Sequence, residues 1–231
     1  MLDVRRTALV AGVLYLVTFV ASIPAVFLLH PVLVDPRYVL GAGADARVVL
    51  GCLLDIVNAV ACVGTAVALF PVVRRQNEAV ALGFVTSRVY EAAVIMIGVV
   101  SLLGVVTLRR DGLDGLEPDT LVATGRGLVA VRDWTFLLGP SLAPGFNAVL
   151  LGYLLYRSGL VPPVIPLLGL VGGPLLIAAT VARMFAGQDH LTALAGIATL
   201  PVFVWELSLG LYLTFRGFRP SAITAGLGAP A

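Results

Sequence analysis

Six long apolar runs restrict the fold of this chain more than any other feature of its sequence. Each run has roughly 20 residues or more, the length that an α-helix needs to cross the apolar core of a bilayer. The runs lie at about residues 7–29, 47–73, 79–107, 134–156, 163–186 and 191–215. The sequence therefore predicts an all-α, polytopic integral membrane protein, a bundle of six transmembrane helices. We expect one transmembrane domain over residues 1–231, with a disordered tail at 220–231.

The composition supports a membrane protein and excludes several other classes. The chain is 59% hydrophobic and only 12% charged, whereas about a quarter of the residues of a soluble domain are charged. The lipid bilayer is therefore the expected partner. The small net charge of +2 is dispersed, which argues against nucleic acid as a partner.

No common cofactor or metal motif occurs in the sequence. There is no lysine, so a Walker phosphate loop is excluded. No CxxC or HExxH pattern is present, and the two histidines, His30 and His190, lie at predicted helix ends. We therefore expect no cofactor and no metal site.

Residues 119–133 do not fit the six-helix pattern cleanly. Leu121, Val122, Leu128 and Val129 form an apolar face, but Arg126 lies elsewhere on the same helix. A short helix at the membrane interface and an extension of the fourth span are the two alternatives, and both are favoured over a seventh crossing.

Arginine placement predicts the orientation of the chain in the membrane. The first apolar run is longer than that of a signal peptide, so we expect an uncleaved helix. Cytoplasmic loops are enriched in basic residues. The side that carries the N-terminus has the larger set of arginines: Arg5, Arg6, Arg74, Arg75, Arg157, Arg216 and Arg219. Both termini are therefore expected to be cytoplasmic.

Two charged residues lie inside the third apolar run, where a bilayer disfavours them. A charge at the centre of a membrane helix costs about 2.5–3.5 kcal/mol and usually faces a partner or a cavity. Arg88 and Glu91 are three residues apart and share a helix face. In the preceding run, Asp55 and Asn58 share a stripe with both cysteines. Because a short turn joins the two helices, we predict an Asp55–Arg88–Glu91 triad near the midplane.

Further polar residues of later runs extend this predicted intramembrane site. Pro140 and Pro144 interrupt the fourth span and free backbone groups that need a partner. Arg183 lies near the end of the fifth span, where its side chain is expected to reach the interface. The predicted polar site comprises Asp55, Asn58, Arg88, Glu91, Arg132, Asp133, Trp134, Asn147 and Glu206.

Three interpretations of these residues remain open. Their charges either pair internally and only fix helix packing, or line a cavity that binds or moves a small solute, proton or lipid headgroup. A third interpretation is an intramembrane hydrolase in which His190 activates Ser141. The sequence favours a non-enzymatic role and assigns no catalytic residue. It does not predict the oligomeric state.

Several stretches are more specific than the general hydropathy pattern. They read "LVAGVLYLVTFVASIPAVFLL", "VGTAVALFPVVRRQNEAVALGFV", "RDWTFLLGP", "LLGYLLYRSGLVP", "GLVGGPLLIA" and "WELSLGLYL". Together they resemble the bacterial membrane family catalogued as domain of unknown function (DUF) 4386, from about Arg5 to Pro220. The resemblance implies a polytopic protein of the bacterial inner membrane, and it implies no particular activity.

Overall fold

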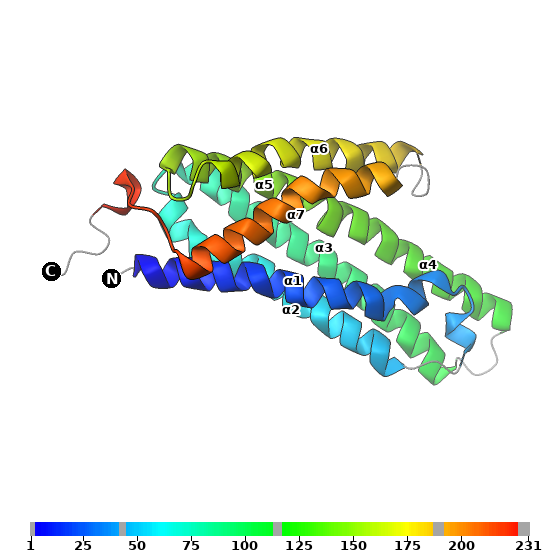
Figure 1. Ribbon diagram of the computed structural model, residues 1–231. Helices are drawn as coiled ribbons and strands as arrows, with labels where there is room; N and C mark the ends of the chain where they lie inside the picture. Colours follow the sequence, from blue (N-terminus) through cyan, green and yellow to red (C-terminus); the bar gives the residue numbers. More distant parts are fainter. Residues whose placement is uncertain (1–2, 42–44, 113–116, 187–191, 226–231) are drawn as a thin grey trace.

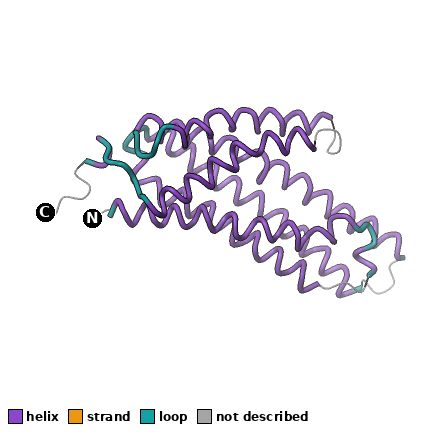
Figure 2. Tube along the Cα trace, in the orientation of Figure 1, coloured by secondary structure: helices purple, strands orange, loops and turns teal. Residues whose placement is uncertain are grey.

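The computed structural model describes residues 3–41, 45–112, 117–186 and 192–225, and in these ranges every regular element is helical (Figures 1 and 2). The long helices are α1 (Val4–Val34), α2 (Asp45–Val73), α3 (Glu78–Asp111), α4 (Pro118–Phe136), α5 (Ala143–Ser158), α6 (Val164–Ala186) and α7 (Thr192–Phe215). Two single turns, η1 (Tyr38–Leu40) and η3 (Ala222–Thr224), lie in connections. A wide π-helical turn, η2 (Leu137–Leu142), joins α4 to α5.

Six helical segments of the described chain are long and apolar enough to cross a membrane. The predicted helical membrane class and six spans are therefore confirmed. The fourth segment runs from Pro118 to Ser158 through α4, η2 and α5. Residues 119–133 thus extend the fourth span, which is one of the two alternatives expected. The helix of this segment begins at Pro118, ahead of the span start predicted at residue 134, and Leu128 of α4 packs on Gly104 of α3.

The helices form a ring in the order of the chain. Consecutive helices pack against each other, except α4 and α5, which η2 joins end to end. In addition, α3 contacts both α4 and α5, and α7 closes the ring by packing against α1. Both ends of the chain lie at one end of the bundle, while α4 reaches the opposite end (Figure 1). We call these the terminal end and the distal end. An even number of spans requires this arrangement of the termini.

Polar side chains and glycine define several helix ends. The Asp3 carboxylate accepts hydrogen bonds from the backbone N–H groups of Arg5 and Arg6 at the start of α1. Asn77 caps α3 by accepting from the Val80 N–H at 3.1 Å, as the short turn after α2 predicts. Gly159 ends α5 with φ of +67°, a conformation that L side chains rarely adopt.

Glycine permits the closest helix contacts of the ring. A Cβ atom at Gly12 of α1 would lie 2.5 Å from the backbone nitrogen of Thr214 in α7. Facing it, a Cβ atom at Gly210 would lie 3.4 Å from the Gly12 carbonyl oxygen. In α6, Gly173 packs against the Gly145 carbonyl of α5, and Gly169 lies against the Trp205 ring. The GxxxG spacing of residues 169–173 therefore serves helix packing.

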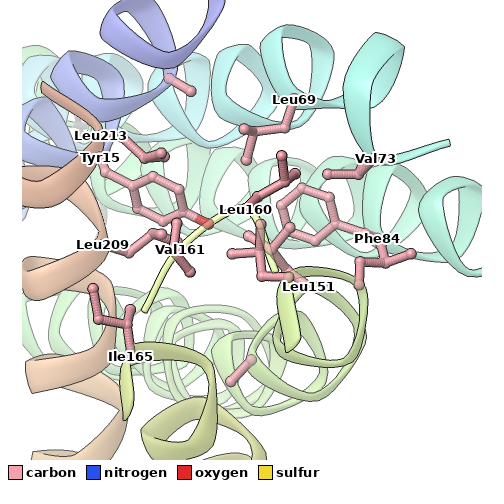
Figure 3. Close-up of a cluster of buried hydrophobic side chains, with 14 of the residues drawn as sticks. Tyr15, Leu69, Val73, Phe84, Leu151, Leu160, Val161, Ile165, Leu209 and Leu213 are labelled. Atoms are coloured by element: carbon pink, nitrogen blue, oxygen red, sulfur yellow. The ribbon is translucent and has the colours of Figure 1, made fainter. Parts of the chain in front are cut away.

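The largest buried apolar cluster lies toward the terminal end of the ring. Figure 3 shows Tyr15 of α1 beside Leu209 and Leu213 of α7, in the same cluster as Phe84 of α3. The outer surface carries large apolar side chains instead of charges. Val20 is 73% exposed and Phe185 is 88% exposed, as expected for side chains that face lipid.

The chain after α7 folds back onto the terminal end of the bundle. The Ser221 hydroxyl donates to the Ser158 carbonyl at 2.5 Å, and Arg75 donates to the Ile223 carbonyl at 3.1 Å. Arg5 donates to the carbonyls of Leu213 and Thr214 at the end of α7. Of the tail expected to be disordered, residues 220–225 are thus placed by contacts, and residues 226–231 lie outside the described ranges.

The glycine crossing of α1 and α7 gives a first prediction. Gly12→Ala inserts a methyl group against backbone, so it should lower the free energy of unfolding by about 1–3 kcal/mol. Gly127→Ala in α4 is the matched control, since a Cβ atom there would meet nothing within 4 Å. Thermal unfolding in lipid nanodiscs measures both. Equal melting temperatures for the two variants would show that α1 and α7 do not cross at these glycines.

Candidate functional site

Arg88 is the centre of a buried charge cluster that joins three helices. Its Nη1 donates to Glu91 Oε2 at 3.1 Å within α3, and its Nη2 donates to Glu206 Oε1 of α7 at 2.5 Å. The Tyr15 hydroxyl of α1 accepts a third hydrogen bond from Nη2 at 3.1 Å. The Arg88 and Glu91 side chains are 2% and 6% exposed, and that of Glu206 is 14% exposed. We call Arg88, Glu91 and Glu206 the Arg88 cluster.

Aromatic and polar neighbours hold this cluster in place. The guanidinium carbon of Arg88 lies 5.1 Å from the Tyr15 ring centre and 5.8 Å from that of Phe84, within the range of cation–π attraction. Asn147 of α5 donates to Glu91 Oε2 at 2.8 Å. With the Cys62 Sγ of α2, which accepts from Arg88 Nη1 at 3.6 Å, the side-chain hydrogen bonds of the Arg88 cluster involve five helices: α1, α2, α3, α5 and α7. One cation lies between two carboxylates.

A second ion pair joins α2 to α4 on the distal side of the first. Arg132 Nη2 donates to Asp55 Oδ2 at 2.8 Å, and both side chains are at most 9% exposed. The guanidinium of Arg132 lies 5.3 Å from the Phe136 ring centre. Because Asp55 pairs with Arg132, the expected contact between Asp55 and Arg88 is wrong, and the buried charges form two separate groups.

Helix length explains why Asp55 and Arg88 do not meet. The prediction counted inward from opposite faces of a core of about 30 Å, but α2 and α3 contain 29 and 34 residues. Counted from the turn that joins them, the residue of α2 level with Arg88 is Cys62, whose Sγ lies 3.6 Å from Arg88 Nη1. Asp55 lies seven residues further along α2, about 10 Å toward the distal end.

A cavity of about 440 Å³ lies against the Arg88 cluster. Most of its wall is apolar, and its polar wall combines the cluster with Asn58, Cys62 and Arg183. The lining residues are Thr18, Phe19, Ser22, Ile23, Val26, Asn58, Cys62, Arg88, Glu91, Phe136, Pro140, Ser141, Pro144, Leu176, Arg183, Gly196, Thr199, Val202, Phe203 and Glu206. We refer to it as the central cavity.

The structure brings five of the nine predicted site residues to the cavity wall or directly behind it. Asn58, Arg88, Glu91 and Glu206 line the cavity, and Asn147 lies behind it on Glu91.

The remaining predicted residues belong to the distal ion pair between α2 and α4 or lie away from the cavity. Asp55 is 6% exposed next to Asn58, and its partner Arg132 is 4% exposed. Asp133 lines a separate hollow of about 330 Å³ at the distal end, next to Asp35 and Arg126. Trp134 is 47% exposed on the outer surface, so it does not join the site.

Two residues of the site were not predicted for it. Tyr15 is fully buried with its hydroxyl on Arg88, and an aromatic residue in an apolar run carries no sequence signal for this role. Arg183 was expected to reach the interface, but it lines the central cavity. Its Nε is buried without a hydrogen-bond partner in the described part of the chain. The sequence feature that could have indicated a role in the site is a basic residue in an otherwise apolar span.

Other buried polar atoms near the site have no partner within the described ranges. They are Arg88 Nε, Asn147 Oδ1, and Nε and Nη1 of Arg132. Most buried polar atoms in proteins are hydrogen-bonded. The Arg88 cluster and its neighbours therefore have hydrogen-bonding capacity beyond the contacts that fix their positions.

The π-helical turn places Pro140 and Ser141 on the cavity wall, and Pro144 lines it from the start of α5. Pro140 and Pro144 were expected to interrupt the span. Instead, the chain stays helical at these residues and the helix widens locally between α4 and α5. The Thr180 hydroxyl of α6 donates to the Ser141 carbonyl at 3.4 Å, which supplies a partner for a freed backbone group. Widened turns of this kind are frequent at functional sites.

The structure offers little for the hydrolase interpretation. Ser141 lines the central cavity, but its expected partner His190 lies outside the described residues. Within the described ranges, no group of three or more His, Cys, Asp or Glu residues is placed to hold a metal ion.

The two ion-pair groups predict a specific pattern of rescue. Arg88→Met leaves Glu91 and Glu206 without their cation, and an unpaired buried charge costs about 3–5 kcal/mol. Adding Glu91→Gln and Glu206→Gln should restore most of the lost stability, whereas adding Asp55→Asn should not.

The matched experiment uses the other pair. Asp55→Asn should rescue Arg132→Met, because Asp55 pairs with Arg132. Arg126→Met, at an exposed position of α4, is the control for loss of an arginine. Melting temperatures in nanodiscs report all variants. Rescue of Arg88→Met by Asp55→Asn alone would contradict the observed pairing.

Comparisons with known proteins agree with the helical membrane architecture. The family model described as domain of unknown function (DUF4386) matches residues 10–217, nearly the whole chain. A comparison with curated proteins and one with solved structures found no match. On the strength of the family match, this six-span helical chain belongs to the DUF4386 family.

Proposed function

We propose that this protein binds a small solute inside the bilayer, with the Arg88 cluster as its polar anchor. The observation that carries the proposal is the central cavity of about 440 Å³. Small-molecule sites typically have volumes of roughly 300–1,000 Å³, apolar walls and a few convergent polar groups. The central cavity has each of these properties, and its charged residues come from α3, α6 and α7.

The charge of the anchor favours a solute with a cationic or hydrogen-bond-donating group. One arginine lies between two glutamates, so the fully ionised cluster carries one surplus negative charge. Glu206 is the most exposed member, and it faces the cavity. A donor on the solute would therefore meet a carboxylate first. The same arrangement suits binding or movement of a proton.

The alternative is that the buried charges only fix helix packing. Charges that only fix helix packing need no cavity beside them, because close packing strengthens the attraction between the paired charges. The cavity beside Glu206, and the unpartnered Arg183 Nε on its wall, support solute binding over this alternative.

The proposed setting is a single transmembrane domain in a bacterial inner membrane, with both termini in the cytoplasm. The terminal end of the bundle carries Arg5, Arg6, Arg74, Arg75, Arg157, Arg216 and Arg219. This excess of arginine supports a cytoplasmic terminal end.

Labelling of the two cysteines tests the proposed cavity. Cys62 lines it and Cys52 does not, although the two are 2% and 1% exposed. In nanodiscs, methyl methanethiosulfonate should modify Cys62 in a Cys52→Ala protein at least about tenfold faster than Cys52 in a Cys62→Ala protein, since access governs thiol reactivity. Mass spectrometry follows the added methylthio group.

A bulky substitution provides the control for access. Ser22→Trp fills the cavity from α1 and should slow the modification of Cys62, whereas Val20→Trp faces lipid on the same helix and should not. If both cysteines react only after a denaturant is added, the charges are packed and the solute-binding proposal fails.

The orientation has its own test. Reporter fusions after Arg75, Arg157 and Arg219 should read as cytoplasmic, and a fusion near Asp114 should read as periplasmic. An opposite reading at Arg75 and Arg219 together would mean that the bundle is inverted. Disagreement between those two positions would mean that the number of spans between them is odd.

A further inference from the structure

The central cavity is bordered by one face of α1 and one face of α7. On α1 these residues are Phe19, Ser22, Ile23 and Val26, and on α7 they are Gly196, Thr199, Phe203 and Glu206. Spacings of three and four residues place each set on a single helix face. Ile23, Val26 and Phe203 are 46%, 50% and 38% exposed, so the border of the cavity between these helices is itself outer, lipid-facing surface.

The path of the two helices explains this lateral border. Close contact at Gly12 and Gly210 fixes α1 against α7 near the terminal end. From there α7 diverges from α1 toward α6 (Figure 1). The ring phenyls of Phe19 and Phe203 still touch edge to face, with centres 5.0 Å apart. Beyond this pair, toward the distal end, Ile23 and Val26 of α1 and Gly196 and Thr199 of α7 line the cavity, which lies between the two helices there.

The two ends of the cavity carry opposite charge. At its inner end the Arg88 cluster has one surplus carboxylate, and Glu206 is its most exposed member. At its distal end Arg183 lies three residues before the end of α6 at Ala186. No ion pair of Arg183 occurs among the residues described, and its Nε is buried without a partner. From Gly196 to Glu206, α7 rises about 15 Å.

We propose that the central cavity takes the headgroup of an ethanolamine phospholipid, which enters sideways from the bilayer between α1 and α7. This inference rests on the proposed function and names its ligand class. A primary ammonium donates charge-assisted hydrogen bonds to the Glu206 carboxylate, and a phosphate accepts them from the Arg183 guanidinium. The acyl chains remain outside, against Ile23 and Val26.

The charge pattern favours this headgroup over the other common ones. An anionic glycerol headgroup would satisfy Arg183 but would place no cation beside Glu206. A choline headgroup has a cation but no N–H donor for the carboxylate. Arg183 also lies near the edge of the membrane, the depth at which lipid phosphates occur. A headgroup bound there sends its ammonium inward, toward the Arg88 cluster.

The experiment measures protection of Cys62, since that thiol lines the same cavity. Cys52→Ala protein is reconstituted in nanodiscs that contain only phosphatidylglycerol, and methyl methanethiosulfonate modifies Cys62 during a titration with oleoyl lysophosphatidylethanolamine. This lipid should slow the modification with a saturable dose response. Oleoyl lysophosphatidylglycerol and oleoyl lysophosphatidylcholine should protect at least about tenfold more weakly, because each lacks one charge-assisted hydrogen bond.

Two substitutions test the two ends of the headgroup separately. Glu206→Gln should remove the preference for the ethanolamine lipid over the glycerol lipid. Arg183→Gln should weaken protection by the ethanolamine lipid but leave protection by oleylamine, which has no phosphate. Glu117→Gln and Arg126→Gln are matched controls, since both positions are exposed and outside the cavity. Both controls should behave as the parent does.

Each outcome distinguishes this inference from the proposed function. If Cys62 is unreactive in the parent, the cavity proposal fails and the lipid proposal fails with it. If Cys62 reacts but all three lysolipids protect equally, only an acyl chain is recognised and the headgroup inference is overturned. If free O-phosphoethanolamine protects as well as the lysolipid, the ligand comes from water, and lateral entry is overturned while solute binding stands.

Discussion

The Arg88 guanidinium is the group on which the arrangement of the other helices depends. Its donors reach Glu91 in its own helix, Tyr15 of α1 and Glu206 of α7. A buried arginine cannot lose its charge in a protein, so it must keep carboxylate partners wherever the bundle places it. This requirement fixes the rotation of α1, α3 and α7 about their axes, and apolar packing such as that in Figure 3 then fills the space around them.

Hydropathy and turn chemistry were sufficient to predict the helices, but they were not sufficient to predict the pairing of the charges. The short turn before Glu78 and the Asn77 cap could be predicted from the sequence, because both depend only on neighbouring residues. The pairing of Asp55 depends on Arg132, 77 positions away, and on how far α2 extends beyond the bilayer core. No single-sequence pattern encodes that distance, and for the same reason nothing indicated Tyr15.

The central cavity follows from two different ways of packing α7. At Gly12 and Gly210 the absence of side chains lets α1 and α7 touch through their backbones. Toward the distal end the pair is held apart by Phe19 and Phe203. The same helix pair therefore closes the ring at one end and borders a cavity at the other, with Glu206 between the two regions.

The pairing of Arg88 with Glu206 also has a consequence for biosynthesis. The chain is made from its N-terminus, so Arg88 enters the membrane long before the last helix exists. During that interval Glu91 is its carboxylate partner, and the space later filled by α7 is open to lipid beside α1 and α6. Arrival of α7 supplies the second carboxylate and closes the ring in one step. The final helix thus completes both the electrostatics and the shape of the bundle, and a ribosome stalled before residue 206 would leave an open, incompletely neutralised intermediate.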